Sequence, residues 1–280
     1  AATDDNIIEA AEHHHIKIMP LVTNSLFDTT IVHQFLHDPS AETKALNTLL
    51  TNCKAKHFDG LQFDFEMVAL SDRDALTAFF KQAADLLHQN KLHISFAVAP
   101  VTSNDPQTYF QKKLYQNWEG AYDLKALGEF ADFISIMTYD QHASGTTPGT
   151  TAGYDWVNQV IINALKVVPA KKISLGIPGY STHWYLGHEA HHTERTHVNM
   201  EALSHADTMK LIEKHHAKLT WDNNAKINYS IFLSDWLNQY VFIEDAKSFA
   251  FKYSLTKKYH LRGISYFDLG SEDPHIWEWL

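Results

Sequence analysis

Three polar side chains, Gln62, Asp64 and Glu66, alternate with large apolar residues in a short segment that is typical of a buried strand. Because successive strand side chains point to opposite faces, the three polar groups share one face. Two buried carboxylates are costly unless they are paired or functional, and their crowding raises at least one pKa. A carboxylic acid that stays protonated near neutral pH is what general acid catalysis requires. The segment therefore predicts a general acid site; the alternative is an edge strand with one solvated face.

A repeating pattern of short apolar runs and longer amphipathic stretches surrounds this segment. The runs are rich in Ile, Val, Leu and Phe and are short enough to be strands buried on both faces. The predicted strands are residues 16–22, 60–65, 93–98, 133–138, 173–177 and 263–267. Apolar side chains at helical spacing predict helices at residues 41–53, 71–88, 154–165 and 244–259. Strands that alternate with helices predict parallel βαβ units and an α/β fold.

One stretch breaks this rhythm, because residues from about 185 to 240 are too many for a simple connection between a strand and a helix. The stretch contains a helix-like part at 200–216 and a strand-like part at 217–232. We interpret it as a small α+β insertion, after which the alternation resumes.

The polar strand resembles a signature of a known family. The spacing Asp59-x-x-Gln62-x-Asp64-x-Glu66 is similar to the strand-four pattern Asp-x-x-Asp-x-Asp-x-Glu of glycoside hydrolase family 18, the chitinase-like TIM barrels. Segments similar to later strands of that family follow in the correct order: Met137-Thr138-Tyr139-Asp140, Ile177-Pro178-Gly179-Tyr180 and Gly263-Ile264-Ser265-Tyr266-Phe267. One such motif is weak evidence, but ordered matches across the chain are strong. Gln62 and the tripeptide Thr147-Pro148-Gly149 favour the spore-cortex and peptidoglycan N-acetylglucosaminidase branch.

The resemblance implies a (β/α)8 TIM barrel. Only six of its eight strands are visible, so we expect the first two βα units to be missing from this chain and to lie upstream of Ala1 in the native protein. Residues 1–15 then correspond to the helix after strand two. The expected division is residues 1–184 for barrel strands three to seven, 185–240 for the insertion, and 241–280 for the last helix, strand eight and a C-terminal helix.

The resemblance also implies a mechanism. Glu66 would protonate the leaving glycosidic oxygen, and the N-acetyl carbonyl of the substrate would attack the anomeric carbon in place of a second carboxylate. Asp64 would hold the acetamido N–H and share a proton with Glu66, and Tyr139 would donate a hydrogen bond to the acetyl oxygen. Retaining hydrolysis of β-1,4-linked N-acetylglucosamine glycans is therefore the expected activity.

Seven further residues form the expected substrate-binding set: Asp59, Gln62, Met137, Asp140, Tyr180, Trp184 and Phe267. Asp59 has the wrong parity for the polar face, so its role requires a local irregularity near Gly60. Two residues depart from the family pattern. Gln62 replaces an Asp, and an amide cannot take a proton from its neighbour. Phe267 replaces a Trp, which leaves less area for stacking on a sugar and no indole N–H.

Two other functions compete with this reading. A catalytically weak glycan-binding protein of the same fold is favoured by Gln62 and Phe267, whereas the retained Glu66 favours the enzyme. A zinc protease is suggested by His188-Glu189-Ala190-His191-His192, which satisfies His-Glu-x-x-His, with His183 or His197 as a third ligand. That motif works on a helix, and a match by chance is expected in a chain with 19 histidines.

Composition limits the partners. The formal net charge of −10 disfavours nucleic acid, whose binding relies on Lys and Arg. No apolar run reaches the roughly 18 residues of a membrane span, and the single cysteine, Cys53, allows no intrachain disulfide. We expect a secreted or cell-envelope bacterial monomer that needs no cofactor and no metal. Although no signal sequence begins at Ala1, a cleaved one would leave no trace. Chitin against peptidoglycan, and endo against exo cleavage, stay open.

Overall fold

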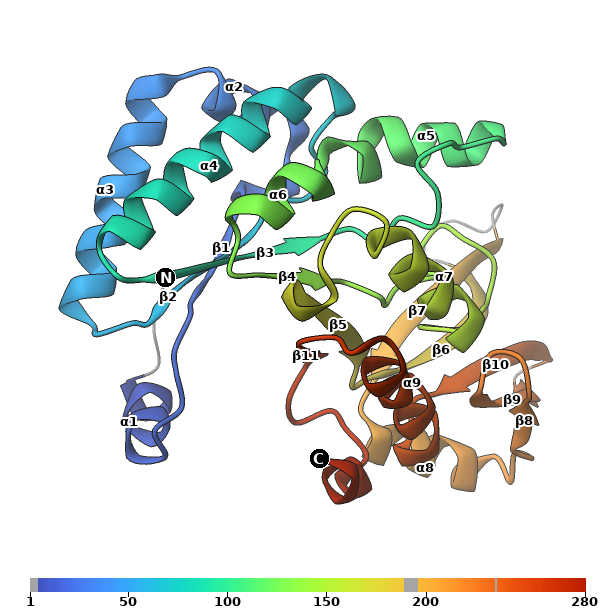
Figure 1. The fold of residues 1–280 in the computed structure, drawn as a ribbon. Coiled ribbons are helices and arrows are strands. Elements are labelled where there is room, and N and C mark those ends of the chain that lie inside the picture. The colour runs from blue at the N-terminus through green and yellow to red at the C-terminus, as the bar shows by residue number, and fades with distance from the viewer. Residues whose placement is uncertain (1–4, 189–195, 235) are drawn as a thin grey trace. The chain divides into compact units, whose positions relative to one another are not determined.

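The computed structural model of the chain consists of two compact units (Figure 1). The residues that the structure describes are 5–188, 196–234 and 236–280. The first unit comprises Ala1–Ser135 with Lys166–Ile173, and the second comprises Ile136–Leu165 with Ser174–Leu280. The boundary therefore falls inside the predicted strand at 133–138, after Leu165 at the end of a predicted helix, and after Ile173, the first residue of another predicted strand.

The first unit contains the predicted strands at 16–22, 60–65 and 93–98 and the first three residues of the one at 133–138. Its elements are α1 (Asp5–His13), β1 (Leu21–Thr23), α2 (Thr29–Leu36), α3 (Pro39–Ala55), β2 (Gly60–Asp64), α4 (Arg73–Gln89), β3 (His93–Val98), α5 (Tyr109–Asn117), α6 (Leu124–Phe130) and β4 (Phe133–Ile136). β1 pairs with β2, and β2 with β3, in parallel register. The helices α3, α4 and α6 run along the same side of these strands (Figure 1).

Two strands are shorter than predicted by two residues or more, for local reasons. In the segment 16–22, Pro20 has no N–H to donate, and the N–H of Ile18 donates to the Asp59 side chain at 2.8 Å instead of to a neighbouring strand. At the end of β4, the N–H of Thr138 donates to the carbonyl of Ile136 at 2.8 Å, which turns the backbone out of the ladder.

A cluster of phenylalanine rings forms the core beneath α4. Phe63 of β2 and Phe65 directly after it pack against Phe79 and Phe80 of α4, and Phe80 stacks on Phe96 of β3 with ring centroids 4.2 Å apart. All five side chains are almost completely buried. This confirms that the apolar face of the strand points to the covering helices, as its alternation predicted.

The second unit combines the last two parallel strands with an antiparallel sheet. Its elements are α7 (Tyr154–Ala164), β5 (Ile173–Pro178), β6 (Ser181–His188), β7 (Thr196–Leu203), α8 (His205–Lys214), β8 (Thr220–Asp222), β9 (Ile227–Ser234), β10 (Leu237–Ile243), α9 (Ala246–Tyr259) and β11 (Gly263–Phe267). β11 pairs in parallel with β5, and the antiparallel strands lie in the order β7-β6-β10-β9-β8. The strand and helix alternation of both units confirms a TIM-barrel-like α/β fold with a small α+β insertion.

The inside of the insertion differs from the prediction. The helix expected at 200–216 begins only at His205, because residues up to Leu203 pair with β6 and Ser204 caps the helix by accepting from the N–H of Asp207. The strand expected at 217–232 is two strands joined by a turn, in which Asp222 accepts from the N–H groups of the two residues that follow Asn223. Side-chain caps of this kind end elements that hydrophobic periodicity alone would continue.

The two ends of the insertion are tied together. Ser181, the first residue of β6, accepts a hydrogen bond from the N–H of Glu244 at 3.0 Å. The Glu244 carboxylate accepts from Lys252 of α9 at 2.6 Å and from Ser248 at 2.8 Å, and both charged side chains are buried. The chain thus leaves and rejoins the α/β framework at one anchored point.

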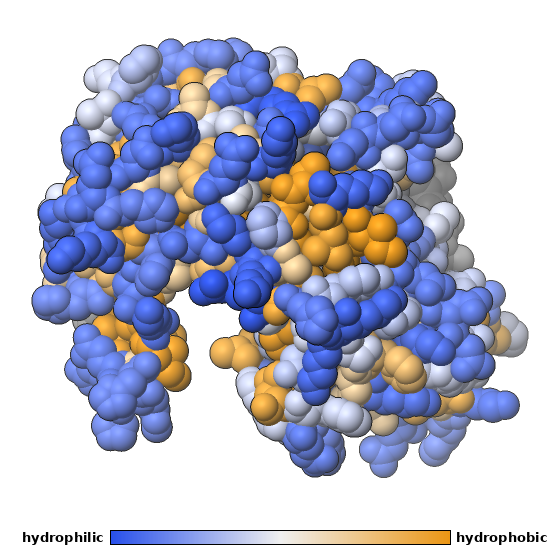
Figure 2. Space-filling view, in the orientation of Figure 1, coloured by the Kyte–Doolittle hydropathy of each residue, from blue (hydrophilic) through white to orange (hydrophobic). Residues whose placement is uncertain are grey.

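The outer surface over α3 and α4 is mainly hydrophilic (Figure 2). Among the described residues, no helix has the length and apolar character that a membrane span demands.

The phenylalanine cluster predicts the first mutational result. Phe63→Ala should lower the free energy of unfolding by about 3–5 kcal/mol, because it leaves a cavity among rings that cannot collapse into it. Urea denaturation at neutral pH measures the change. Phe110→Ala on α5, where the ring is 62% exposed, is the control and should change stability by less than about 1 kcal/mol. Equal losses in the two variants would contradict this account of the core.

Candidate active site

The backbone of Glu66 is held in place from the neighbouring strand. Glu66 follows the carboxyl end of β2, and Asn24 follows the carboxyl end of β1. The side-chain amide of Asn24 donates to the carbonyl of Glu66 at 2.9 Å and accepts from its N–H at 2.9 Å. Asn24 is 7% exposed. One buried amide therefore satisfies both backbone groups of the candidate acid, at the strand end where barrel active sites form.

The side chain of Glu66 has a partner from a later loop. The indole Nε1–H of Trp118, at the end of α5, donates to Oε2 of Glu66 at 3.2 Å. Beside it, the buried hydroxyl of Tyr122 donates to the carbonyl of Phe65 at 2.6 Å. Burial, together with the nearby charges of Glu66 and Asp64, raises the pKa of Tyr122 well above its ordinary value, so it stays a donor at any physiological pH. The contact with Trp118 orients the carboxyl group, and the contact with Tyr122 holds the backbone directly before it.

Asp64 lies on the polar face of β2 and is 8% exposed. Its Oδ1 atom has no hydrogen-bond partner among the described residues. Burial raises the pKa of Asp64 from its ordinary value near 3.8 to about 6. An unpartnered buried oxygen is unusual and marks a group that is available to a ligand. A carboxyl group with this pKa can gain or lose a proton close to neutral pH.

Asp59 lies at the opposite end of the strand. Its carboxylate accepts from the N–H of Ile18, and its backbone bonds to both neighbouring segments. The next residue, Gly60, has no room for a side chain, because a Cβ there would lie 2.1 Å from the carbonyl oxygen of His93. Asp59 therefore joins the strands at their amino ends, and the structure does not support the expectation that it binds substrate. Gln62, between the two ends, is partly buried on the polar face.

The second unit gathers a separate group of aromatic and acidic residues. The ring of Tyr139 stacks on Phe267 with centroids 5.4 Å apart and planes 18° apart. The hydroxyl of Tyr180 donates to Asp140 at 2.5 Å, and the ring of Tyr180 meets Phe267 edge to face. Phe267 is 50% exposed, so it offers a free ring face. A cis peptide bond, which the sequence does not reveal, joins it to Asp268.

A cavity of about 430 Å³ adjoins this group. Its lining consists of Asp140, Tyr180, Met200, Ala202, Leu203, Ser204, Phe267, Asp268 and Ser271. The lining mixes carboxylates, hydroxyls and an exposed aromatic face, which suits a sugar ring with its polar edge and apolar faces. Met137, a predicted binding residue, is instead buried at the end of β4.

Trp184 does not belong to this surface. Its side chain is completely buried in β6, and its indole nitrogen has no hydrogen-bond partner among the described residues. A fully buried ring cannot stack on a sugar, so the expectation that Trp184 binds substrate is not supported by this structure.

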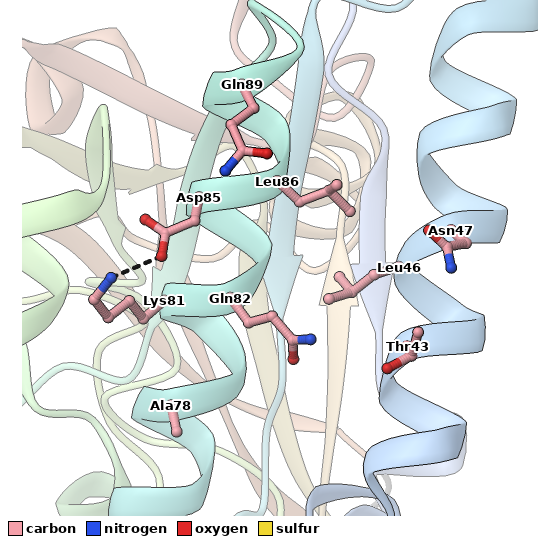
Figure 3. Close-up of a pocket in the computed structure, with 9 residues that line it drawn as sticks. All are labelled: Thr43, Leu46, Asn47, Ala78, Lys81, Gln82, Asp85, Leu86 and Gln89. Carbon is pink, nitrogen blue, oxygen red and sulfur yellow. Dashed lines mark hydrogen bonds and ion pairs between the residues drawn. The ribbon is translucent and has the colours of Figure 1, made fainter.

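A hollow between α3 and α4 lies on the outer side of the first unit (Figure 3). The two charged groups that line it, Lys81 and Asp85, are paired at 2.7 Å. The remaining lining residues are amide, hydroxyl and apolar groups, so this hollow lacks a free acid or base and is not a candidate catalytic site.

The His-Glu-x-x-His sequence falls largely on residues 189–195, outside the described residues. His188 itself ends strand β6. His183, a proposed third ligand, uses both ring nitrogens in contacts of 2.7 Å with Glu201 and Gln239. These contacts give His183 a structural role within the antiparallel sheet.

Trp118, Tyr122 and Asn24 are the contacts that sequence reasoning missed. Trp118 is one of several aromatic residues that the sequence offers as lining of a sugar cleft, but nothing in the sequence links it to Glu66, and Tyr122 carries no motif. The position of Asn24 gives a usable signal, because a polar residue directly after a barrel strand faces the same edge as the residues that follow β2.

Comparison with known proteins agrees with the fold and with the strand motifs. Residues 5–273 match the family described as "Glycosyl hydrolases family 18". The chain is 31% identical over 276 residues to the cortical fragment-lytic enzyme of Bacillus subtilis (strain 168), a match that covers 97% of this chain and 61% of that protein.

Two solved structures are similar over nearly the whole chain. The spore cortex-lytic enzyme SleL of Bacillus megaterium QM B1551 superposes with a TM-score of 0.86 at 26% identity, covering 100% of this chain and 62% of that one. A chitinase from Chromobacterium violaceum ATCC 12472 gives a TM-score of 0.87 at 28% identity, covering 99% and 83%. The chain spans about three fifths of the length of its spore-cortex relatives. These matches and the ordered strand motifs show that the chain belongs to glycoside hydrolase family 18 and that it is similar to the spore cortex-lytic enzymes of that family.

Proposed function

We propose that this chain carries the catalytic part of a retaining glycosidase that cleaves β-1,4-linked N-acetylglucosamine glycans, with Glu66 as general acid and base. The observation that carries the proposal is the support of Glu66. Asn24 makes two hydrogen bonds to its backbone, and Trp118 donates one to its carboxyl group. Asp64 lies on the same strand face, and its raised pKa allows proton exchange near neutral pH.

In the proposed first step, Glu66 gives its proton to the glycosidic oxygen as the bond to the anomeric carbon breaks. The acetamido carbonyl oxygen of the same sugar attacks that carbon and forms a cyclic intermediate. Asp64 in its ionised form accepts the acetamido N–H, and Tyr139 donates its hydroxyl proton to a hydrogen bond with the acetyl oxygen. Glu66, now ionised, then takes a proton from the water that opens the ring, which retains the configuration.

Gln62 limits the number of groups that can exchange a proton with Glu66. Its amide holds no exchangeable acid proton, so sharing is limited to Asp64 and Glu66. The Oδ1 atom of Asp64 is buried and has no partner among the described residues. This supports the proposal that Asp64 binds the acetamido N–H of a substrate, because that N–H would supply the missing hydrogen bond. Phe267, Asp140 and Tyr180 are proposed to bind sugar through the exposed ring face and the acidic cavity beside it.

The named relatives favour a cell-wall substrate. They include cortex-lytic enzymes and a chitinase, and all such glycans offer the N-acetyl group that the mechanism needs. We propose peptidoglycan fragments as the first substrate class and chitin oligomers as the second, with action outside the cytoplasm as a monomer.

A catalytically weak glycan-binding protein is the second candidate. The observation that favours it is Phe267, whose ring is half exposed and stacked on Tyr139. That arrangement can hold a sugar without turning it over.

Glu66→Gln tests the assignment of the acid. Hydrolysis should fall by about 100- to 10,000-fold, because the amide cannot donate a proton to the leaving oxygen, while glycan binding persists. Purified spore-cortex sacculi and chito-oligosaccharides, with products read by mass spectrometry, measure the loss and identify the substrate class. Glu129→Gln, at an exposed position on α6, is the control and should keep full activity. Binding without turnover by the unmutated chain would reject the enzyme in favour of the second candidate.

Asp64→Asn tests the buried carboxyl group through the pH dependence of stability. The pKa of Asp64 is higher in the folded chain, so the folded state holds the proton more tightly than the unfolded state. Its stabilising contribution is complete below pH 3.8 and is lost as the pH rises to about 6. Asn cannot ionise, so its contribution to stability does not change with pH. The free energy of unfolding of the variant minus that of the unmutated chain should therefore be larger at pH 8 than at pH 4, by on the order of 1 kcal/mol.

Chemical denaturation at the two pH values measures this difference, and the same variant should lose activity. Comparing the variant with the unmutated chain at each pH cancels the titration of the groups that do not interact with Asp64. A stability difference that does not change with pH would show that burial does not raise the pKa of Asp64.

A further inference from the structure

Helix α2 and the start of α4 bring together two histidines and a buried aspartate, none of which the proposed mechanism uses. The Nδ1 atom of His33 lies 2.9 and 3.0 Å from the two carboxylate oxygens of Asp72, and Nε2 of His37 lies 3.2 Å from one of them. The two imidazole rings are 4.6 Å apart. Three groups that can each donate a lone pair therefore converge on one point.

The local structure explains why they converge. His33 is in the last turn of α2 and His37 is its C-cap, so their spacing of one helical turn places both rings on the same side. Asp72 occupies the N-cap position of α4, yet its side chain accepts no capping hydrogen bond. A carboxylate that is 2% exposed and gives up the usual N-cap contact is committed to the two histidines instead.

We propose that His33, His37 and Asp72 bind a zinc ion. Zinc bound tetrahedrally to nitrogen and oxygen at 2.0–2.2 Å separates its ligand atoms by roughly 3.3 Å. The three ligand atoms lie within 4.8 Å of one another, so small rotations of the side chains admit the ion. Both imidazoles are about half exposed, at 54% and 53%, which leaves room for water as the fourth ligand.

The ligand set selects the class of metal. Two imidazoles with one carboxylate suit zinc and similar transition metals, whereas calcium and magnesium prefer a shell of oxygen atoms. This site departs from the expectation that the chain needs no metal. It is separate from the His-Glu-x-x-His sequence, and no step of the proposed mechanism passes through it.

The location indicates a structural role. Asp72 follows the segment that begins with Glu66, and Thr29 at the start of α2 already donates to the carbonyl of Met67 at 2.8 Å. A metal between α2 and Asp72 would join the same two segments at a second point. It would therefore stabilise the loop that carries the proposed acid, whether or not that acid is catalytic.

The test uses the full chain, freed of metal with a chelator, and zinc chloride alone as the probe. We expect equilibrium dialysis with elemental analysis to show one tightly bound zinc, and saturating zinc to raise the midpoint of thermal unfolding by about 3 °C or more. The double variant His33→Gln with His37→Gln should lose that zinc and that shift. Gln is a poor zinc ligand but can still donate a hydrogen bond to Asp72, so a purely structural contact would survive.

A matched control addresses the many other histidines. His88→Ala removes a histidine that bonds to Asp132 at 3.0 Å, and it should keep both the bound zinc and the thermal shift. The proposal is overturned if the double variant binds zinc as tightly as the unmutated chain, if the unmutated chain binds none, or if the tight zinc is lost only in the His88 variant. Circular dichroism confirms that each variant is folded before dialysis.

Discussion

The packing of Phe63 and Phe65 against α4 is the interaction on which the other features of the first unit depend. A strand has only two faces, so burying its aromatic residues under a helix sends every second side chain the other way. That geometry places Gln62 and Asp64 on a common face and delivers Glu66 just beyond the strand end. A register shift of one residue would exchange the rings for the carboxylates, at the cost of burying charge in an apolar core. The packing of these rings against α4 therefore determines both the orientation of the strand and the position of its polar face.

Periodicity predicted the elements whose sequence pattern and structure are both regular. All six parallel strands and the helices α3, α4, α7 and α9 lie where alternation and helical spacing placed them, within a few residues. The strand ends were less predictable, because a single side chain or a missing N–H decides them, as Asp59 and Pro20 do beside β1. The insertion was predicted as a region but not in detail. There, the cap at Ser204 and the turn at Asp222 override the longer-range pattern.

The residues of the candidate site also differ in how well the sequence predicted them. The motif residues were accessible to sequence reasoning because their spacing follows strand geometry. Contacts made by residues distant in the chain were not, since nothing in the sequence near Trp118 indicates that its indole reaches Glu66. Burial also removed a predicted residue: Trp184 has the right chemistry for a sugar, but strand pairing in the antiparallel sheet buries it. The type of a residue indicates which ligand it could bind, but only an exposed side chain can make that contact.

The contact between Asn24 and the backbone of Glu66 restricts the sequence at position 24. A side chain there must present one donor and one acceptor at a fixed distance from its own backbone. A carboxylate lacks the donor, a hydroxyl is too short to reach both backbone groups, and glutamine carries an extra methylene that displaces the amide. Asparagine is the side chain that meets all of these conditions. An asparagine directly after the preceding strand is therefore a diagnostic feature, independent of the acidic motif, for recognising chains that hold their acid in the same way.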